Sequence, residues 1–236
     1  KVYFDEQGNT WIATHNGLNK LSKTKNIFTS FSERTNNQKS IRGQKIKHIE
    51  IDKDNSVWVS HENGLDHVHN TGESIAQYSS DPTNVNSLLT METNVFKKLS
   101  NGRIWIASEH NGVTVLDVEN NIFTRYEHSD ENENSIIEGK IECIYEDLDG
   151  TVWLSSINGV CLFKNNKFKN FIFNPSLQNN HVSGVTAFLD DSDGEFWVGT
   201  SANGLFKVNK PDMSFKEHYI LDTNDKNSFA SSVVLA

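Results

Sequence analysis

The sequence predicts an all-β protein, a β-propeller made of about five four-stranded antiparallel blades. Its five tryptophans lie 47, 47, 48 and 44 residues apart, which is an internal repeat. Most of them follow an Asp-x-x-Gly turn, and all of them precede an Asn-Gly pair by about six residues. Each repeat also contains four short apolar segments separated by polar turns. A period of roughly 40 to 50 residues built from short strands is typical of a propeller blade, which needs neighbouring blades to cover both faces of its sheet.

The second repeat illustrates the expected order of strands. Residues 45–51 form the first strand, 52–55 a tight turn, and 56–60 the second strand, whereas the third strand begins at the glycine of the Asn-Gly pair. The fourth strand carries two aromatic residues in most repeats, at a spacing of three or four that predicts a twisted or bulged strand. The turn has glycine or asparagine at one shared position, and these residue types adopt positive φ most readily: Gly8, Asn55, Gly102, Gly150 and Gly194.

The strand that carries the tryptophan is expected to be covered on both sides, because apolar residues flank each tryptophan. The residue two positions after the tryptophan is always small, so each bulky indole lies beside space that a facing sheet can fill. The predicted structural core therefore includes Trp11, Trp58, Trp105, Trp153 and Trp197.

The repeats divide a single propeller region, 1–236, at approximately 1–39, 40–86, 87–134, 135–180 and 181–227. Residues 228–236 are the start of a further blade or a closing strand, since the repeat phase places both termini within a first strand. Two architectures remain possible at this point: a closed ring of five blades, and five blades of a larger ring. The chain begins at Lys1 without a methionine or a signal peptide, which favours a piece of a longer protein.

Composition and motifs exclude several functions. A net charge of −9 disfavours binding to nucleic acid, which requires a basic surface. No run approaches the ~18 apolar residues that a membrane span requires, so no direct membrane insertion is expected. Cys143 and Cys161 are expected to pack as small apolar residues. His67 and His69 share a strand face without a third ligand nearby, and neither a metal site, a cofactor nor a catalytic residue is predicted.

The repeated residues resemble the two-component regulator propeller repeat. The pattern is Asp-x-x-Gly-x-x-Trp-[Ile/Val]-[Ala/Gly]-[Thr/Ser]-x-x-Gly-Leu, and the stretch from Asp5 to Leu18 fits it throughout. An Asn-Ser pair follows the fourth strand in several repeats, as at Asn86-Ser87, Asn134-Ser135 and Asn227-Ser228. The third repeat departs from the pattern, with Leu99 in place of the turn aspartate, and the fourth lacks the Asn-Ser pair.

This resemblance implies the sensor region of a bacterial hybrid two-component histidine kinase, on the periplasmic or extracellular side of the membrane. It implies a non-catalytic segment that binds an oligosaccharide and signals to downstream domains of the same chain, with a homodimer as a further partner. It also favours five blades cut from a larger, seven-bladed ring. Two other functions remain open: a carbohydrate-active propeller enzyme, and a structural protein-interaction propeller.

A binding site is expected where the second-to-third-strand loops and the connections between repeats meet, because recognition concentrates in polar loops on a rigid scaffold. Arg42 is the candidate for an anionic sugar substituent, since a guanidinium offers a planar fork to carboxylate or sulfate. The full set of candidates is His15, Arg42, His61, Glu62, Glu109, His110 and His181.

Overall fold

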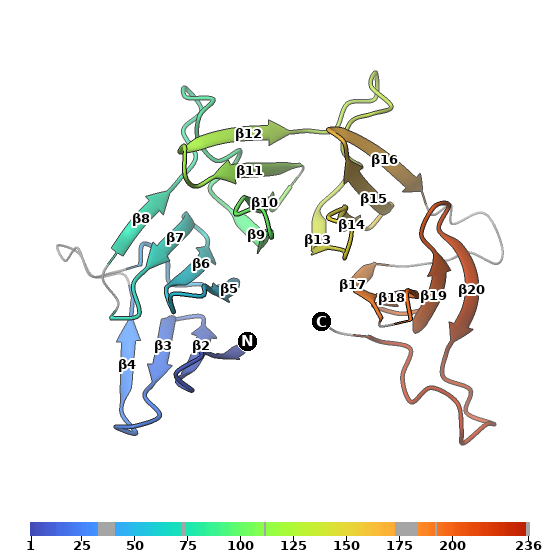
Figure 1. Cartoon of the computed structure of the whole chain (residues 1–236), viewed down its shortest axis with the longest axis horizontal. Helices are drawn as coiled ribbons and strands as arrows, with labels where there is room; N and C mark the ends of the chain where they lie inside the picture. The colour runs from blue at the N-terminus through green and yellow to red at the C-terminus, as the bar shows by residue number, and fades with distance from the viewer. Residues whose placement is uncertain (33–40, 72–73, 111, 173–183, 192, 235–236) are drawn as a thin grey trace. The chain divides into compact units, whose positions relative to one another are not determined.

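The computed structural model describes the chain except for residues 33–40, 72–73, 111, 173–183, 192 and 235–236. The described residues form five separate four-stranded antiparallel sheets, which we call blades 1 to 5 in chain order (Figure 1). In each blade the strands are hydrogen-bonded in sequence order. The predicted all-β architecture of five four-stranded blades is therefore confirmed.

The first of two compact units comprises residues 1–98, 102–109 and 113–125 and contains blades 1 and 2 and most of blade 3. Blade 1 consists of β1 (Val2–Phe4), β2 (Thr10–Thr14), β3 (Gly17–Leu21) and β4 (Phe28–Phe31). Blade 2 consists of β5 (His48–Ile51), β6 (Val57–His61), β7 (Gly64–Val68) and β8 (Ser74–Tyr78). Blade 3 consists of β9 (Thr93–Lys98), β10 (Ile104–Ser108), β11 (Val113–Asp117) and β12 (Ile122–Tyr126).

The second unit comprises residues 99–101, 110–112 and 126–236 and contains blades 4 and 5. Blade 4 consists of β13 (Ile141–Glu146), β14 (Val152–Ser156), β15 (Gly159–Lys164) and β16 (Lys167–Ile172). Blade 5 consists of β17 (Val185–Asp190), β18 (Phe196–Thr200), β19 (Leu205–Asn209) and β20 (Ser214–Tyr219).

The turn between the first two strands of a blade has the backbone conformation that its sequence predicts. Positive φ occurs at the shared position in all five blades: 76° at Gly8, 65° at Asn55, 81° at Gly102, and 78° at both Gly150 and Gly194. Only residues with little steric penalty in the left-handed region fit this turn, which explains why glycine and asparagine recur there.

The turn aspartate also orients the tryptophan that follows it. In blade 4, one carboxylate oxygen of Asp147 accepts the Thr151 backbone N–H at 2.9 Å, and the other accepts the Trp153 indole N–H at 2.8 Å. The same Asp-to-Trp bond, six residues apart, measures 3.0 Å at Trp11, 3.5 Å at Trp58 and 2.7 Å at Trp197. One side chain thus closes the turn and satisfies an indole donor, which is costly to bury without a partner.

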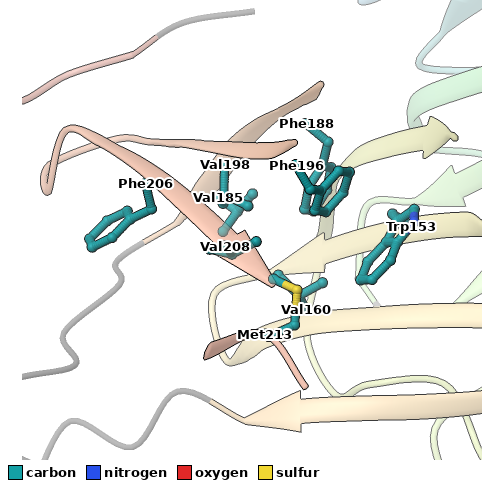
Figure 2. Close-up of a cluster of buried hydrophobic side chains, with 9 residues drawn as sticks. All are labelled: Trp153, Val160, Val185, Phe188, Phe196, Val198, Phe206, Val208 and Met213. Atoms are coloured by element: carbon teal, nitrogen blue, oxygen red, sulfur yellow. The ribbon is translucent and has the colours of Figure 1, made fainter. Parts of the chain in front are cut away.

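Each tryptophan of blades 1, 2 and 4 packs into an apolar cluster shared with the next blade. Figure 2 shows the cluster of the second unit, where Trp153 and Val160 of blade 4 meet residues of blade 5. The Trp153 ring lies 4.7 Å from that of Phe196 and 6.2 Å from that of Phe188. All residues of β6, β10 and β14 are buried, as expected for a strand covered on both sides.

The small residue two positions after the tryptophan allows close approach of the chain segment that follows the blade. Ser155 donates its hydroxyl to the Val185 carbonyl at 2.7 Å. At Gly199, an added Cβ atom would lie only 2.6 Å from the Val234 side chain. A larger residue at either position would separate β14 or β18 from the chain that follows.

The Asn-Ser pairs belong to compact polar loops that their own serine closes. Ser87 accepts the Asp81 backbone N–H at 2.9 Å, Ser135 accepts that of Ser129 at 3.0 Å, and Ser228 accepts that of Asp222 at 3.0 Å. The serine is therefore repeated because it closes a loop by bonding to the residue six positions before it, independently of any ligand.

The fourth strand is bulged in blades 2 and 5, whereas β4 and β16 pair in continuous register although they carry aromatic residues three positions apart, so the aromatic spacing alone does not predict the bulge. The pairing register shifts between His67 and Val68 in blade 2 and between Lys207 and Val208 in blade 5. Cys143 is half-buried and Cys161 is fully buried, and burial raises the pKa of the Cys161 thiol to about 12.

Replacing Trp153 by alanine should lower the free energy of unfolding by roughly 3 to 5 kcal/mol, because the change leaves a cavity in a shared core. The matched control is Trp197→Ala, since Trp197 has the same aspartate bond but is only half-buried. Chemical denaturation should give a clearly smaller loss for the control. Equal losses would show that packing against the next blade does not stabilise the tryptophan.

Candidate functional site

Most predicted binding residues of the first unit lie along one side of it, which we call the loop face. This face is formed by the β2–β3 and β6–β7 loops, by Glu109 after β10, and by the segment that enters blade 2. That segment is bonded to the loops: the Gln44 carbonyl accepts the Gly17 N–H at 2.8 Å, and the Thr14 carbonyl accepts the Ile46 N–H at 3.1 Å. The expected gathering of loops is therefore present within this unit.

Arg42 lies on the loop face, but its guanidinium is engaged by the protein. Its Nε and Nη2 atoms donate to one oxygen of Asp66 at 3.1 and 2.9 Å, and Nη2 also donates to the Tyr78 carbonyl at 3.0 Å. The second Asp66 oxygen accepts the Arg42 backbone N–H at 2.7 Å. The Asp66 side chain is fully buried, so Arg42 neutralises a carboxylate inside blade 2.

His61 is also part of this buried cluster. Its Nδ1 accepts the Asn63 backbone N–H at 3.1 Å, so the neutral ring carries its proton on Nε2. Nε2 lies 3.1 Å from Asp66 Oδ2, within ion-pairing distance but outside hydrogen-bond geometry. Burial by itself raises the pKa of a carboxyl group. The nearby Nε2–H of His61, the backbone N–H of Arg42 and the charge of its guanidinium together outweigh that effect and hold the pKa of Asp66 below its usual range.

Glu62 and Glu109 also have protein partners. Glu62 accepts the backbone N–H groups of Gln44 and Lys45 at 3.0 and 2.9 Å, which fixes the segment entering blade 2. Glu109 pairs with Lys47 at 2.8 Å and so connects blade 3 to that segment. Both carboxylates are engaged by the protein and stabilise the loop face. That they also contact a ligand stays a prediction.

The remaining candidates differ in their placement. His15 is exposed on the β2–β3 loop of the first unit, and His110 is exposed in the second unit. His181 lies outside the described residues. Beside His15, Gln44 and Lys45 present exposed side chains on the loop face. These are the residues of the first unit that a ligand on this face would meet first.

Sequence reasoning did not identify Asp66 as the centre of the Arg42 cluster. The signal was available, because Asp66 is the only charged residue at a position that carries Asn19, Thr114, Cys161 and Phe206 in the other blades. A carboxylate in a buried strand requires a charged or hydrogen-bonding partner. The sequence does not show which cation meets it, since Arg42 lies 24 residues away.

The described residues contain no group of three or more metal-binding side chains. His67 lies flat on Trp58, with ring centroids 3.9 Å apart, and its Nε2 is 2.7 Å from Ser56 Oγ. Ser56 donates its hydroxyl to Asp54, so its oxygen accepts from His67. Burial lowers the pKa of His67 to about 4. This histidine is therefore a neutral stacking partner of Trp58.

One segment of the chain matches a known protein family. Residues 176–202 match the model of the two component regulator propeller. This match confirms, within residues 176–202, the resemblance inferred from the repeats. No curated protein matches the chain.

Several solved structures share the fold. The extracellular domain of BT3049 from B. thetaiotaomicron, described as a hybrid two component system, aligns with a TM-score of 0.64 at 18% identity. The extracellular domain of BT4673 from the same organism is described both as a one component and as a hybrid two component system. It aligns with a TM-score of 0.68 at 15% identity. PorZ of Porphyromonas gingivalis, a surface component of the type-IX secretion system, aligns with a TM-score of 0.66 at 18% identity.

These alignments cover 98 to 100% of this chain but only 34 to 36% of the other proteins. The chain thus spans about a third of the length of these structures. At sequence identities of 15 to 18%, the structural similarity shows a shared fold and nothing further. Within the described residues, no helix is long and apolar enough to cross a membrane.

Replacing Arg42 by alanine should destabilise the protein by about 3 kcal/mol at pH 7, because it leaves the Asp66 carboxylate buried without its cation. Adding Asp66→Asn to that variant should recover part of the loss, which a double-mutant cycle measured by denaturation would detect. His15→Ala, on the same face but exposed, is the control and should change stability by less than about 0.5 kcal/mol.

The effect should also depend on pH. A carboxyl group with a lowered pKa in the folded state stabilises the protein above its unfolded pKa of about 4, and this contribution disappears as the pH falls through the folded pKa. The cost of Arg42→Ala should therefore shrink in acid. A cost that is small at pH 7, or unchanged by Asp66→Asn, would leave Arg42 available to a ligand.

Proposed function

We propose that this chain is a non-catalytic, ligand-binding propeller segment of an extracytoplasmic sensor in two-component signal transduction. The observation that carries this proposal is the match of residues 176–202 to the two component regulator propeller. The fold shared with extracellular domains described as two component systems supports the same conclusion and favours a location outside the cytoplasm. Downstream signalling domains would then belong to the same polypeptide.

The loop face of the first unit is the proposed binding surface. Its backbone is fixed by the Arg42–Asp66 cluster and by Glu62, so the exposed side chains of His15 and Lys45 project from a preorganised support. Preorganised polar groups bind a polar ligand with little loss of conformational entropy. An oligosaccharide with an anionic substituent fits this chemistry, since Lys45 supplies a positive charge and His15 a hydrogen-bonding ring.

Signalling would follow from differential binding. A ligand changes the output only if it binds one arrangement of the protein more tightly than another. The segment that enters blade 2 is bonded to blade 1 through Gln44 and to blade 3 through Lys47, so a ligand on Lys45 acts where three blades meet. Ligand binding there would favour one packing of these blades, and a homodimer would transmit the difference between two kinase domains.

A structural protein-interaction propeller is the second candidate, and the similarity to PorZ favours it. PorZ is described as an essential surface component of a secretion system, so the fold also occurs in proteins of secretion machinery. In that case the loop face would bind a protein surface, and no glycan would compete with it.

The proposal is tested by isothermal titration calorimetry of the purified chain against a panel of neutral, uronate-containing and sulfated oligosaccharides. At least one glycan should bind. His15→Ala and Lys45→Ala should each weaken binding about tenfold, as expected for the loss of a hydrogen bond to a charged group. Their melting temperatures should stay unchanged, because both side chains are exposed.

The matched control is Lys25→Ala, an exposed lysine on the opposite, turn side of blade 1. An equal loss of affinity in this control would place the site elsewhere. Hydrolysis of a glycan during the titration would favour the carbohydrate-active enzyme, and absence of binding to the whole panel would favour the protein-interaction propeller.

A further inference from the structure

The connection between blades 3 and 4 contains a histidine that contacts both ends of one polar loop. This loop, residues 129–135, is the one that Ser135 closes. The His128 Nδ1 atom lies 2.8 Å from the Ile136 carbonyl oxygen, and its Nε2 atom lies 3.1 Å from Asp130 Oδ1. Asp130 is the second residue of the loop and Ile136 follows its last residue, so the ring joins the two ends.

Only the protonated ring makes both contacts as hydrogen bonds. A backbone carbonyl oxygen accepts and never donates, so Nδ1 must carry a proton to bond Ile136. An ionised carboxylate also only accepts, so Nε2 must carry a proton to bond Asp130. A neutral imidazole has a single N–H group, and the lone pair of its other nitrogen would then face an oxygen atom. The arrangement is therefore complete only when His128 is positively charged.

The surroundings of His128 favour this charged form. The Ile136 carbonyl raises the pKa of His128 most, Asp130 adds to it as a hydrogen-bond acceptor and as a charge, and Glu138 adds a smaller electrostatic effect. Together they outweigh burial, which by itself lowers the pKa of a histidine. The Asp130 side chain is almost fully exposed, so solvent and salt weaken its contribution. The bond to the Ile136 carbonyl is therefore the main support of the cation.

The other charged groups of this segment act in the same direction. Three exposed carboxylates flank His128 in the sequence: Glu127, Glu131 and Glu133. The cations that come next along the chain on either side are engaged by other groups. Arg125 donates to the Ser87 carbonyl at 3.0 Å, and Lys140 pairs with Glu142 at 3.6 Å. The segment thus has an excess of negative charge, which stabilises a cationic ring.

The equivalent residue does not titrate in the other two loops that a serine closes. Seven positions before the closing serine, the loop of residues 81–87 has Ser80 and the loop of residues 222–228 has Leu221. Ser80 donates its hydroxyl to the Leu89 carbonyl at 3.4 Å, which fastens that loop to the segment entering blade 3. A hydroxyl makes this bond without a change of charge near neutral pH. Among these three loops, only the one beside His128 is fastened by a group that titrates there.

From this geometry we propose that His128 is a pH-dependent clamp, which holds residues 129–135 closed in acid and releases them in mild alkali. Because the folded-state pKa is raised, the clamp is complete below the unfolded value of about 6.5 and is lost as the pH rises through the folded value. The same connection continues into Glu138, whose carbonyl accepts the Asn158 amide of the β14–β15 loop at 3.2 Å. This response to acidity goes beyond the proposed function, since it needs no ligand and lies in the second unit.

The test follows the ring and the loop separately by NMR of the whole chain, from about pH 5.5 to about pH 8.5, which brackets the titration of histidine. The imidazole signal of His128, identified by its absence from His128→Ser, should titrate above about 6.5, and Asp130→Asn should lower that pKa. The backbone N–H groups of Asn132 and Ser135 report on loop opening, because both are bonded within the loop. Their solvent exchange, corrected for its intrinsic pH dependence, should accelerate at least about threefold across this range.

The loop of residues 81–87 is the control within the same sample. Its Asn84 N–H bonds to the Asp81 carbonyl as the Asn132 N–H bonds to that of Ser129, and its corrected exchange rate should not change with pH. His128→Ser, which copies the residue of the control loop, should make Asn132 equally insensitive. A pKa of His128 at or below its ordinary value would contradict the clamp. An exchange rate of Asn132 that does not respond to pH, or that responds equally in His128→Ser, would show that the ring does not hold the loop.

Discussion

The hydrogen bond between a turn aspartate and the tryptophan six residues later organises each blade that has it. The carboxylate satisfies backbone N–H groups of the turn with one oxygen and the indole N–H with the other, as Asp147 does for Thr151 and Trp153. A large apolar side chain is thereby fixed in direction with no buried donor left unpaired. The next blade then packs against an indole that is already in place.

Much of the fold could be predicted because its determinants lie close together in sequence. The positive-φ position, represented by Gly8 and Asn55, and the buried strand around each tryptophan depend on contacts within a few residues, and they repeat in every blade. Because these residues recur at the same position of each repeat, they can be recognised as structural from the sequence alone. The third blade shows how much variation is tolerated, since Leu99 replaces the aspartate and is itself buried.

The candidate site was less predictable for the opposite reason. Arg42, Asp66 and Tyr78 meet across 24 and 36 residues, and they occur together in one blade only. Periodicity identifies positions that recur, whereas this cluster is a unique pairing between a connection and a strand. The sequence predicted a group of charged and histidine residues on the loop face, but it gave no means of separating those that hold the face together from His15, which is exposed.

These two observations distinguish two classes of residue in the molecule. The repeated residues build blades that pack through their tryptophans, while the residues that differ between blades shape the loop face. The sensor function proposed above would require such a distinction, because binding residues must vary without loss of the scaffold. The polar loops closed by Ser87, Ser135 and Ser228 belong to the scaffold despite their exposed position.

The most direct test of this account is the hydrogen exchange of the five indole N–H groups, followed by NMR in native conditions. Every tryptophan that packs against the next blade of its unit should exchange slowly, and Trp153 serves as the reference. Trp197 should exchange at least tenfold faster, although its aspartate bond is as short as that of Trp153, because no described blade covers it. Equal rates for Trp153 and Trp197 would contradict the claim that each blade is held by its tryptophan packing against the next.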